Sequence, residues 1–342
     1  MLRRCVTVPF FLGALVLLTA LLPVLLLAMG SVDLLRLLRG HRPPSAIRCL
    51  AAFWCLFFVE VVCLVGMLLA WLLGPPWTEA GRQRCLRRTK KVEIFYQMSL
   101  HHCARVLFRL RYDVEGDQDL LPGPILIIGR HSSALDTVLP TSIATMRHGL
   151  QIRYVLKLEL IYDPCFDIVA DRLPHCFVGR EGQGDDRDRQ AVAAVGSGLG
   201  PRDAVLLYPE GTRFSRRKRE RILASLEKRA PELLPRAQRL RHLLPPRPGG
   251  LSTLLTAAPD ADVVLFAHRG YEEGSWVLSE LWEGGLVGRT IRVRFERFRR
   301  AEIPTDPEAR VEWLYDTWQR LDDWLEQCAR EEQAARAGIR EF

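Results

Sequence analysis

The sequence predicts an α/β protein, with a mostly parallel sheet flanked by helices and an N-terminal membrane segment of two helices ahead of it. Two observations lead to this prediction. The first 75 residues contain two long stretches almost without charge, and the rest of the chain alternates between short apolar runs and helical patterns. With 342 residues and 48% hydrophobic content, the chain is large enough to bury a sizeable core.

The two apolar stretches lie at residues 5–32, which hold no charge, and 49–73, where Glu60 is the only charged residue. Each exceeds the roughly 20 residues that cross a bilayer core, so we expect a membrane helical hairpin within residues 1–80. A cleaved signal peptide is disfavoured, because the first run is too long and lacks a good cleavage site. The basic residues that flank the two stretches favour a cytoplasmic location for the N-terminus and for the chain after Trp77. Two interfacial or re-entrant helices are the alternative, because the connecting loop is also basic.

Glu60 is the one carboxylate inside these stretches. An ionisable residue at this depth is by default a candidate functional site. The interpretation we favour is structural: the carboxyl group is protonated, or it faces the other N-terminal helix.

Residues 81–342 are predicted to form the α/β domain. A helical pattern runs through about Leu107 and then alternates into a strand. Further strands are expected at 124–129, 152–157, 175–180, 204–211, 261–270 and 289–298. A basic helical insertion broken by prolines spans 214–248. A C-terminal helix is expected at 306–336, and core packing is favoured over a membrane belt for the side of this helix that carries Trp313, Trp318 and Trp324.

Composition narrows the class of protein. The net charge of +8 suits a partner such as anionic lipid or nucleic acid. Nine cysteines, an odd number with no C-x-x-C pair, argue against a disulfide framework and against a structural zinc site. A reducing compartment fits this cysteine usage.

The stretch "RHSSALDT", at 130–137, follows the apolar run at 124–129. His131 is thereby placed at the carboxyl end of a strand, where open α/β sheets bind their ligands. Asp136 can reach back to one imidazole nitrogen while the other nitrogen removes a proton from a substrate hydroxyl. Alternatively, Ser133 and Asp136 form an S-x-x-D capping box, which leaves His131 unexplained.

A second polar cluster, "LLYPEGTRFS", also follows a predicted buried strand. Gly211 permits a tight turn, and Arg213 supplies a planar donor fork suited to phosphate. A solvated arginine on a loop is the alternative interpretation of Arg213.

Together, "HSSALD" and "EGTR", about 75 residues apart, resemble the H-x4-D and E-G-T-R motifs of the glycerophospholipid acyltransferase family, which includes 1-acylglycerol-3-phosphate acyltransferases. The stretch "KLELIYDPCFDIVADRLPHCFVGR" resembles the second block of that family, with Asp167 where a glycine is common. The stretch "LLPPRPGG" resembles the fourth block, particularly in the lysocardiolipin-type branch. The resemblance covers about residues 95–270.

The resemblance implies roles for individual residues. It makes His131 the general base and Asp136 the residue that orients it. The substrate-binding residues that it implies are Lys157, Arg180, Glu210, Gly211, Thr212 and Arg213, with Arg180 and Arg213 on the acceptor phosphate. It implies no metal and no permanently bound cofactor, with an acyl-CoA or acyl-carrier-protein thioester as donor.

We therefore expect a membrane-bound O-acyltransferase that moves an acyl chain directly onto a lysophospholipid, with 1-acylglycerol-3-phosphate as acceptor and phosphatidic acid as product. We expect it at the cell (inner) membrane, with the catalytic domain on the cytoplasmic side and anionic lipids, but no nucleic acid, as partners. One alternative is another lysophospholipid headgroup. A serine hydrolase using Ser132 or Ser133 is disfavoured, because no G-x-S-x-G elbow is present. A non-enzymatic binder would leave both polar clusters without a role.

Overall fold

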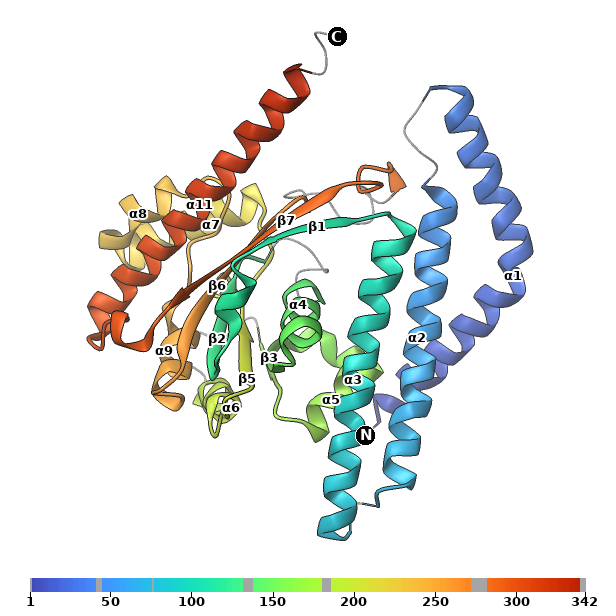
Figure 1. Cartoon of the computed structure of the whole chain (residues 1–342), viewed down its shortest axis with the longest axis horizontal. Helices are drawn as coiled ribbons and strands as arrows, with labels where there is room; N and C mark the ends of the chain where they lie inside the picture. Colours follow the sequence, from blue (N-terminus) through green and yellow to red (C-terminus); the bar gives the residue numbers. More distant parts are fainter. Residues whose placement is uncertain are drawn as a thin grey trace. The chain divides into compact units, whose positions relative to one another are not determined.

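The computed structural model describes residues 2–40, 45–75, 77–131, 138–179, 186–271 and 282–338 (Figure 1). The chain divides into two compact units, and each is described by itself. Unit 1 comprises Met1–Arg111, Thr137–Val195 and Trp276–Thr290. Unit 2 comprises Tyr112–Asp136, Gly196–Ser275 and Ile291–Phe342.

Three long helices dominate unit 1: α1 (Arg4–Leu38), α2 (Ala46–Leu72) and α3 (Glu79–Leu107). Helix α2 packs between α1 and α3 (Figure 1). Its length and apolar composition are sufficient to cross a membrane. The first two helices match the two apolar stretches predicted from the sequence.

Helix α1 is bent by 66° between Arg4–Ala20 and Leu22–Leu38. Pro23 follows the break, and a proline inside a helix lacks the amide that would bond four residues back and clashes with the carbonyl there. The two halves of α1 therefore run in different directions. Of the two apolar segments, α2 is straight enough to count as one span, and α1 counts only as a bent pair.

The carboxylates near these apolar helices have structural partners. Asp33, near the end of α1, accepts hydrogen bonds from the backbone amides of Ser45 (3.0 Å), Ala46 (2.9 Å) and Ile47 (3.0 Å), where α2 begins. Because the first amides of a helix have no partner within it, Asp33 caps α2.

Glu60 is fully buried, and its carboxylate accepts the backbone amide of Cys165 at 3.0 Å. Cys165 belongs to the first turn of α5 (Pro164–Arg172), where Asp163 caps the amide of Phe166 at 3.0 Å. Burial raises the pKa of Asp163 to about 7, and the nearby Glu60 carboxylate adds to the shift. Glu60 thus contacts the start of α5. The partner found for its carboxylate is the start of α5, about 105 residues later, where the sequence suggested a protonated group or one that faces the other N-terminal helix.

Asp167, the residue that departs from the family pattern, has a structural explanation. Its side chain lies on α5, is buried, and forms ion pairs with Arg3 and Arg4, each with an N–O distance of 2.5 Å. Arg4 also donates to the Asp167 backbone carbonyl at 3.2 Å. A glycine could make none of these side-chain contacts. This Arg3/Arg4–Asp167 clamp fastens the beginning of the chain to α5.

The remaining elements of unit 1 are α4 (Val138–His148), β3 (Gln151–Lys157), η3 (Leu158–Tyr162), β4 (Cys176–Val178) and α6 (Asp186–Gly196). Strands β3 and β4 pair in parallel, with Leu156 opposite Phe177. Helix α4 packs against α3 and β3.

The strands of unit 2 lie in the order β1 (Arg111–Glu115), β7 (Thr290–Phe298), β6 (Asp262–Arg269), β2 (Ile125–Gly129) and β5 (Asp203–Leu207). Strand β2 is parallel to both β5 and β6, and β7 is antiparallel to β6. Every residue of β2 is buried, as expected of a central strand covered on both faces. Gly129 is required here, because a Cβ would lie 2.8 Å from the Phe266 ring on β6.

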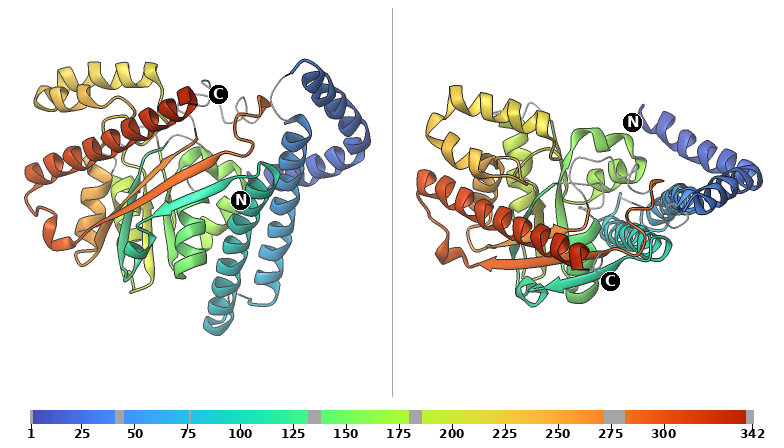
Figure 2. Two further views of the ribbon diagram at one scale, coloured as in Figure 1. Left: turned by 45° about the horizontal axis from the view of Figure 1, so that its top comes forward. Right: turned by 90° about the horizontal axis from the view of Figure 1, so that it is seen from above.

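Helices complete unit 2: α7 (Arg216–Arg229), α8 (Leu234–Arg239), α9 (Pro248–Ala257) and α11 (Pro307–Gly338), with short turns η1 (Asp117–Leu120), η4 (Pro231–Leu233) and η5 (Arg300–Glu302). Helix α11 packs against α8, α9 and β6 (Figure 2). Trp318 on α11 is fully buried, and its indole donates to the Leu244 carbonyl at 3.1 Å. Core packing of this helix, predicted from the sequence, is confirmed at Trp318.

The predicted α/β class with mostly parallel strands and flanking helices is confirmed. The predicted strands agree with the structure to within a few residues, except at 204–211. There β5 ends at Leu207, because Tyr208 to Gly211 form a turn.

Candidate active site

The register of two parallel strands brings the two polar clusters together. Ile128 of β2 lies opposite Leu207 of β5. His131 and Glu210 each follow three residues after that pair. Because both strands run in the same direction, the residues after them meet at one edge of the sheet.

His131 is held by its backbone on both sides. A carboxylate oxygen of Glu210 accepts the His131 amide at 3.4 Å, and the amide of Phe214 donates to the His131 carbonyl at 3.1 Å. His131 is therefore held by Glu210, the first residue of the E-G-T-R motif, and by Phe214, the residue directly after that motif. Both His131 and Glu210 are buried, with 8% and 1% of their surface exposed.

The imidazole of His131 stacks on the ring of Tyr208. Their centroids lie 4.8 Å apart, and their planes meet at 27°. Such offset stacking limits how far the imidazole can rotate without losing the contact. The orientation of the imidazole is thus influenced by the residue that immediately follows β5.

Gly211 makes the turn possible. Its φ angle is +65°, in the left-handed region that costs other residues about 1–2 kcal/mol, and its amide donates to the Tyr208 carbonyl at 2.9 Å. This turn redirects the chain from β5 toward Arg213.

Lys218, in the first turn of α7, fixes the rest of the E-G-T-R segment. Its ammonium donates to the hydroxyl of Thr212 at 2.9 Å and to the carbonyl of Arg213 at 3.0 Å. Ser215 caps the same helix by accepting the Lys218 amide at 3.3 Å. The backbone of Arg213 is thereby positioned, while its side chain is exposed.

The structure brings together His131, Glu210, Gly211, Thr212 and Arg213 within unit 2. Lys157 is the last residue of β3 in unit 1. Asp136 and Arg180 lie outside the described residues, as do Ser132 and Ser133, so the proposed histidine–aspartate contact and the capping box both stay predictions. Within the described residues, no three acidic, histidine or cysteine side chains gather as a metal site.

Residues beyond the motifs also contribute to the site. Tyr208, Phe214 and Lys218 make the contacts described above, and none was singled out from the sequence. Tyr208 and Phe214 lie on either side of the E-G-T-R motif. Their position just after a predicted strand was the signal by which the sequence could have identified them. Arg247, within "LLPPRPGG", donates its amide to the carbonyl of Pro209 at 2.9 Å, a contact that depends on how the insertion folds.

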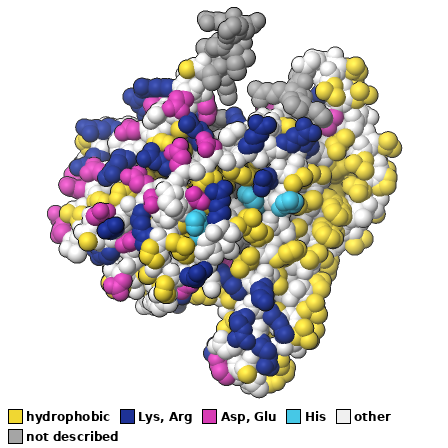
Figure 3. All heavy atoms as spheres, in the orientation of Figure 1, with side chains coloured by type: hydrophobic (Ala, Val, Ile, Leu, Met, Phe, Trp, Pro, Cys, Tyr) yellow, Lys and Arg dark blue, Asp and Glu magenta, His cyan; other side chains and the backbone are white. Residues whose placement is uncertain are grey.

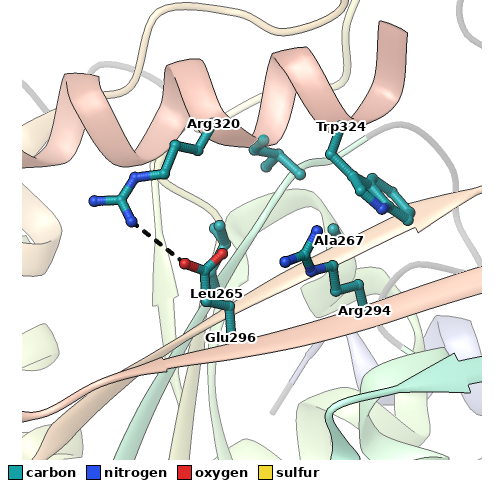
Figure 4. Close-up of a pocket in the computed structure, with 7 residues that line it drawn as sticks. Leu265, Ala267, Arg294, Glu296, Arg320 and Trp324 are labelled. Atoms are coloured by element: carbon teal, nitrogen blue, oxygen red, sulfur yellow. Dashed lines mark hydrogen bonds and ion pairs between the residues drawn. The ribbon is translucent and has the colours of Figure 1, made fainter. Parts of the chain in front are cut away.

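A small cavity elsewhere in unit 2 is too small for a substrate (Figure 4). It holds about 20 Å³ and is lined by Leu265, Ala267, Arg294, Glu296, Arg320, Leu321 and Trp324. A volume of this size accommodates about one water molecule. In Figure 4 the Arg320 guanidinium, on α11, reaches the Glu296 carboxylate on β7, at 3.4 Å. This cavity belongs to the packing of α11 on the sheet.

Comparison with known proteins supports an acyl-transfer function. Residues 111–265 match the family model described as Acyltransferase. The chain is 24% identical over 213 residues to 1-acyl-sn-glycerol-3-phosphate acyltransferase epsilon of Mus musculus. This alignment covers 59% of this chain and 57% of that protein. It is 26% identical over 138 residues to an uncharacterized acyltransferase of Schizosaccharomyces pombe, over 36% of this chain and 37% of that protein. The chain thus spans only part of the length of both relatives.

A solved structure is also similar: PlsC, the 1-acyl-sn-glycerophosphate (LPA) acyltransferase of Thermotoga maritima, aligns with a TM-score of 0.48 and 13% identity over 83% of this chain and 97% of that one. The family match and the curated relatives support an acyltransferase domain within residues 111–265. Over residues 111–265 the chain is similar to the glycerophospholipid acyltransferase family, in agreement with its H-x4-D and E-G-T-R motifs.

Proposed function

We propose that this acyltransferase moves an acyl chain from a thioester to the free hydroxyl of a lysophospholipid, with 1-acylglycerol-3-phosphate as acceptor and phosphatidic acid as product. The observation that carries the proposal is the attachment of His131 to Glu210 of the E-G-T-R motif through its amide, and to Phe214 directly after the motif through its carbonyl. A basic side chain for proton removal and an arginine suited to phosphate are then parts of one assembly.

His131 acts as the general base. Its imidazole takes the proton of the acceptor hydroxyl while the hydroxyl oxygen attacks the thioester carbonyl. The resulting tetrahedral intermediate collapses as the carbon–sulfur bond breaks. The thiolate leaves with the proton that His131 returns, and the new ester bond remains on the acceptor. Asp136 would hold the imidazole in the tautomer that this step needs.

The acceptor is chosen from the chemistry of the turn and from the relatives. Arg213 offers two parallel donors to a phosphate, which a monoester presents at the end of the molecule. The mouse relative is named for 1-acyl-sn-glycerol-3-phosphate as its acceptor. A lysophospholipid with a larger headgroup is the second candidate, and acyl-CoA or acyl carrier protein supplies the thioester.

We further propose that the enzyme resides at the cell (inner) membrane, with the catalytic domain on the cytoplasmic side. Hydrophobic side chains gather over α1 and α2, and basic side chains gather at the foot of α3 (Figure 3). Exposed hydrophobic residues on these helices include Phe10, Val16, Leu27, Phe58 and Leu72. An apolar band beside a basic rim suits insertion into a membrane with anionic headgroups.

The test is an assay of the purified enzyme in detergent, with one acyl-CoA and a panel of lysophospholipids that differ only in headgroup. We expect the highest kcat/KM with 1-acylglycerol-3-phosphate. Preference for a larger headgroup would transfer the proposal to the second candidate. Incubation with labelled acyl-CoA alone should leave no label on the protein, and stable label on Ser132 or Ser133 would indicate a covalent mechanism instead.

The membrane arrangement has its own test. Cysteine-accessibility mapping at engineered positions should place residue 2 and residues after Trp77 on the same, cytoplasmic, side. A result that places them on opposite sides of the membrane would contradict the hairpin.

A further inference from the structure

The basic insertion leaves and rejoins the sheet at the same turn. It begins directly after Arg213, where the amide of Phe214 bonds to His131. It ends at Arg247, whose amide donates to the carbonyl of Pro209 at 2.9 Å. Arg213 and Arg247 are 34 residues apart in sequence and are attached to one four-residue turn.

The side chain of Arg247 lies along this turn. A Cβ placed on Gly211 would be 3.5 Å from a terminal guanidinium nitrogen of Arg247, 3.6 Å from its central carbon and 3.7 Å from its Cδ. These are ordinary van der Waals distances, so Arg247 occupies the space next to the exposed face of Gly211. The glycine leaves this face open, because it has no side chain to separate the guanidinium from the turn.

Arg247 is exposed, and it forms no ion pair with any carboxylate of the described residues. Other arginines of unit 2 do pair with carboxylates, as Arg297 does with Asp262 at 2.6 Å and Arg236 does with Asp316. Arg213 is likewise exposed, and it has no ion pair within the part of the chain that the structure describes. Arg213 and Arg247 thus carry guanidinium groups on residues attached to one turn, and a phosphate bound there would accept hydrogen bonds from both.

We propose that Arg247 is a second phosphate-binding residue of the acceptor site, acting with Arg213 on the phosphate of the lysophospholipid. This inference rests on the proposed function and deepens it. Lys218 is a positioning residue in this arrangement, because its ammonium is engaged by Thr212 and by the carbonyl of Arg213. The phosphates of coenzyme A are the other source of the same chemistry, and the experiment separates the two.

The experiment measures steady-state kinetics of Arg247→Gln in the full-length enzyme, varying 1-acylglycerol-3-phosphate and acyl-CoA in turn. Loss of one charge-assisted contact should raise the KM for the lysophospholipid by about tenfold or more, with kcat near the wild-type value. The KM for acyl-CoA should stay unchanged. The matched control is Arg202→Gln, which removes an exposed arginine without an ion pair from the opposite end of β5, and it should change neither constant.

A second measurement does not depend on turnover. Calorimetric titration with glycerol 3-phosphate should show weaker binding to Arg247→Gln than to the wild type or to Arg202→Gln, and equal binding would overturn the proposal. An increase confined to the KM for acyl-CoA would also overturn it, because Arg247 would then bind the coenzyme.

The results distinguish a failure of the proposed role of Arg247 from a failure of the proposed function. If Arg213→Lys raises the acceptor KM while Arg247→Gln does not, only the role of Arg247 is lost. If the wild type fails to acylate 1-acylglycerol-3-phosphate at all, the proposed function is lost, whereas the titration with glycerol 3-phosphate still reports on the arginine pair. Arg247→Lys is the folding control: it keeps the charge, and it should recover part of the affinity.

Discussion

The imidazole of His131 and the ring of Tyr208 stack 4.8 Å apart at the ends of two parallel strands. The pair joins a residue after β2 to a residue after β5, so the geometry of His131 depends on the register of the sheet. Together with the contacts from Glu210 and Phe214, it makes the E-G-T-R segment the support of the proposed base. Changes at Tyr208 or Glu210, whose side chains contact His131, are therefore expected to affect proton removal.

Replacement of His131 tests the proposed chemistry. His131→Ala should lower kcat roughly 10²- to 10⁴-fold, the usual contribution of a general base. The measurement is acyl transfer from labelled acyl-CoA, with far-ultraviolet circular dichroism to confirm that the variant is folded. His102→Ala removes an exposed histidine from α3 and serves as the control. Full activity of His131→Ala would end the assignment.

Arg213→Lys tests phosphate recognition. Lysine keeps the charge and loses the two-pronged geometry, so the KM for the lysophospholipid should rise while kcat and the KM for acyl-CoA change little. A thermodynamic cycle compares the wild type and Arg213→Lys, each with 1-acylglycerol-3-phosphate and with an uncharged monoacylglycerol as acceptor. Removing the phosphate should cost the wild type more than the variant, because the variant has already lost part of the contact. Simply additive losses would show that Arg213 does not touch the phosphate.

Gly211→Ala tests the left-handed turn. Because φ is +65° and the new Cβ would meet Arg247 only at ordinary contact distance, backbone strain is the main cost. We expect a loss of about 1 kcal/mol in stability, read as a lower melting temperature in detergent. Gly211→Asn should lose less, since asparagine adopts this conformation more readily. Equal stability of wild type and Gly211→Ala would mean that the turn has another conformation.

The Arg3/Arg4–Asp167 clamp predicts a pH dependence. Burial tends to raise the pKa of Asp167, but the Arg3 and Arg4 guanidinium groups outweigh it and hold that pKa below its ordinary value. A lowered folded-state pKa contributes stability that is present above the unfolded pKa of about 3.9 and disappears as pH falls through the folded value. Asp167→Asn should therefore melt at a lower temperature than the wild type at pH 7.

The difference in melting temperature between Asp167→Asn and the wild type should shrink as the pH falls below about 4. The double variant Arg3→Gln/Arg4→Gln should lower the melting temperature at neutral pH, and combining it with Asp167→Asn should add little, because the three residues act together. A difference that stays constant down to pH 3 would contradict the clamp.

The α/β class, the order of most elements and the identity of the motif residues could be predicted from the sequence. Apolar runs and helical spacing are local signals. A strand that is buried on both faces, such as β2, is visible in the sequence as a continuous apolar run, here at 125–128. The turn after Leu207 was missed, because the apolar run continues through Tyr208 and gives no local sign of where strand pairing stops.

Only the tertiary structure decided which residues meet. The partner of Glu60 is a helix start about 105 residues later, and the partners of Asp167 are the third and fourth residues of the chain. Arg247 reaches Gly211 because the insertion returns to the turn where it began. Such contacts depend on strand register and on how helices pack. A residue's local pattern shows that it is buried or charged, while its partner is set by the path of the whole chain.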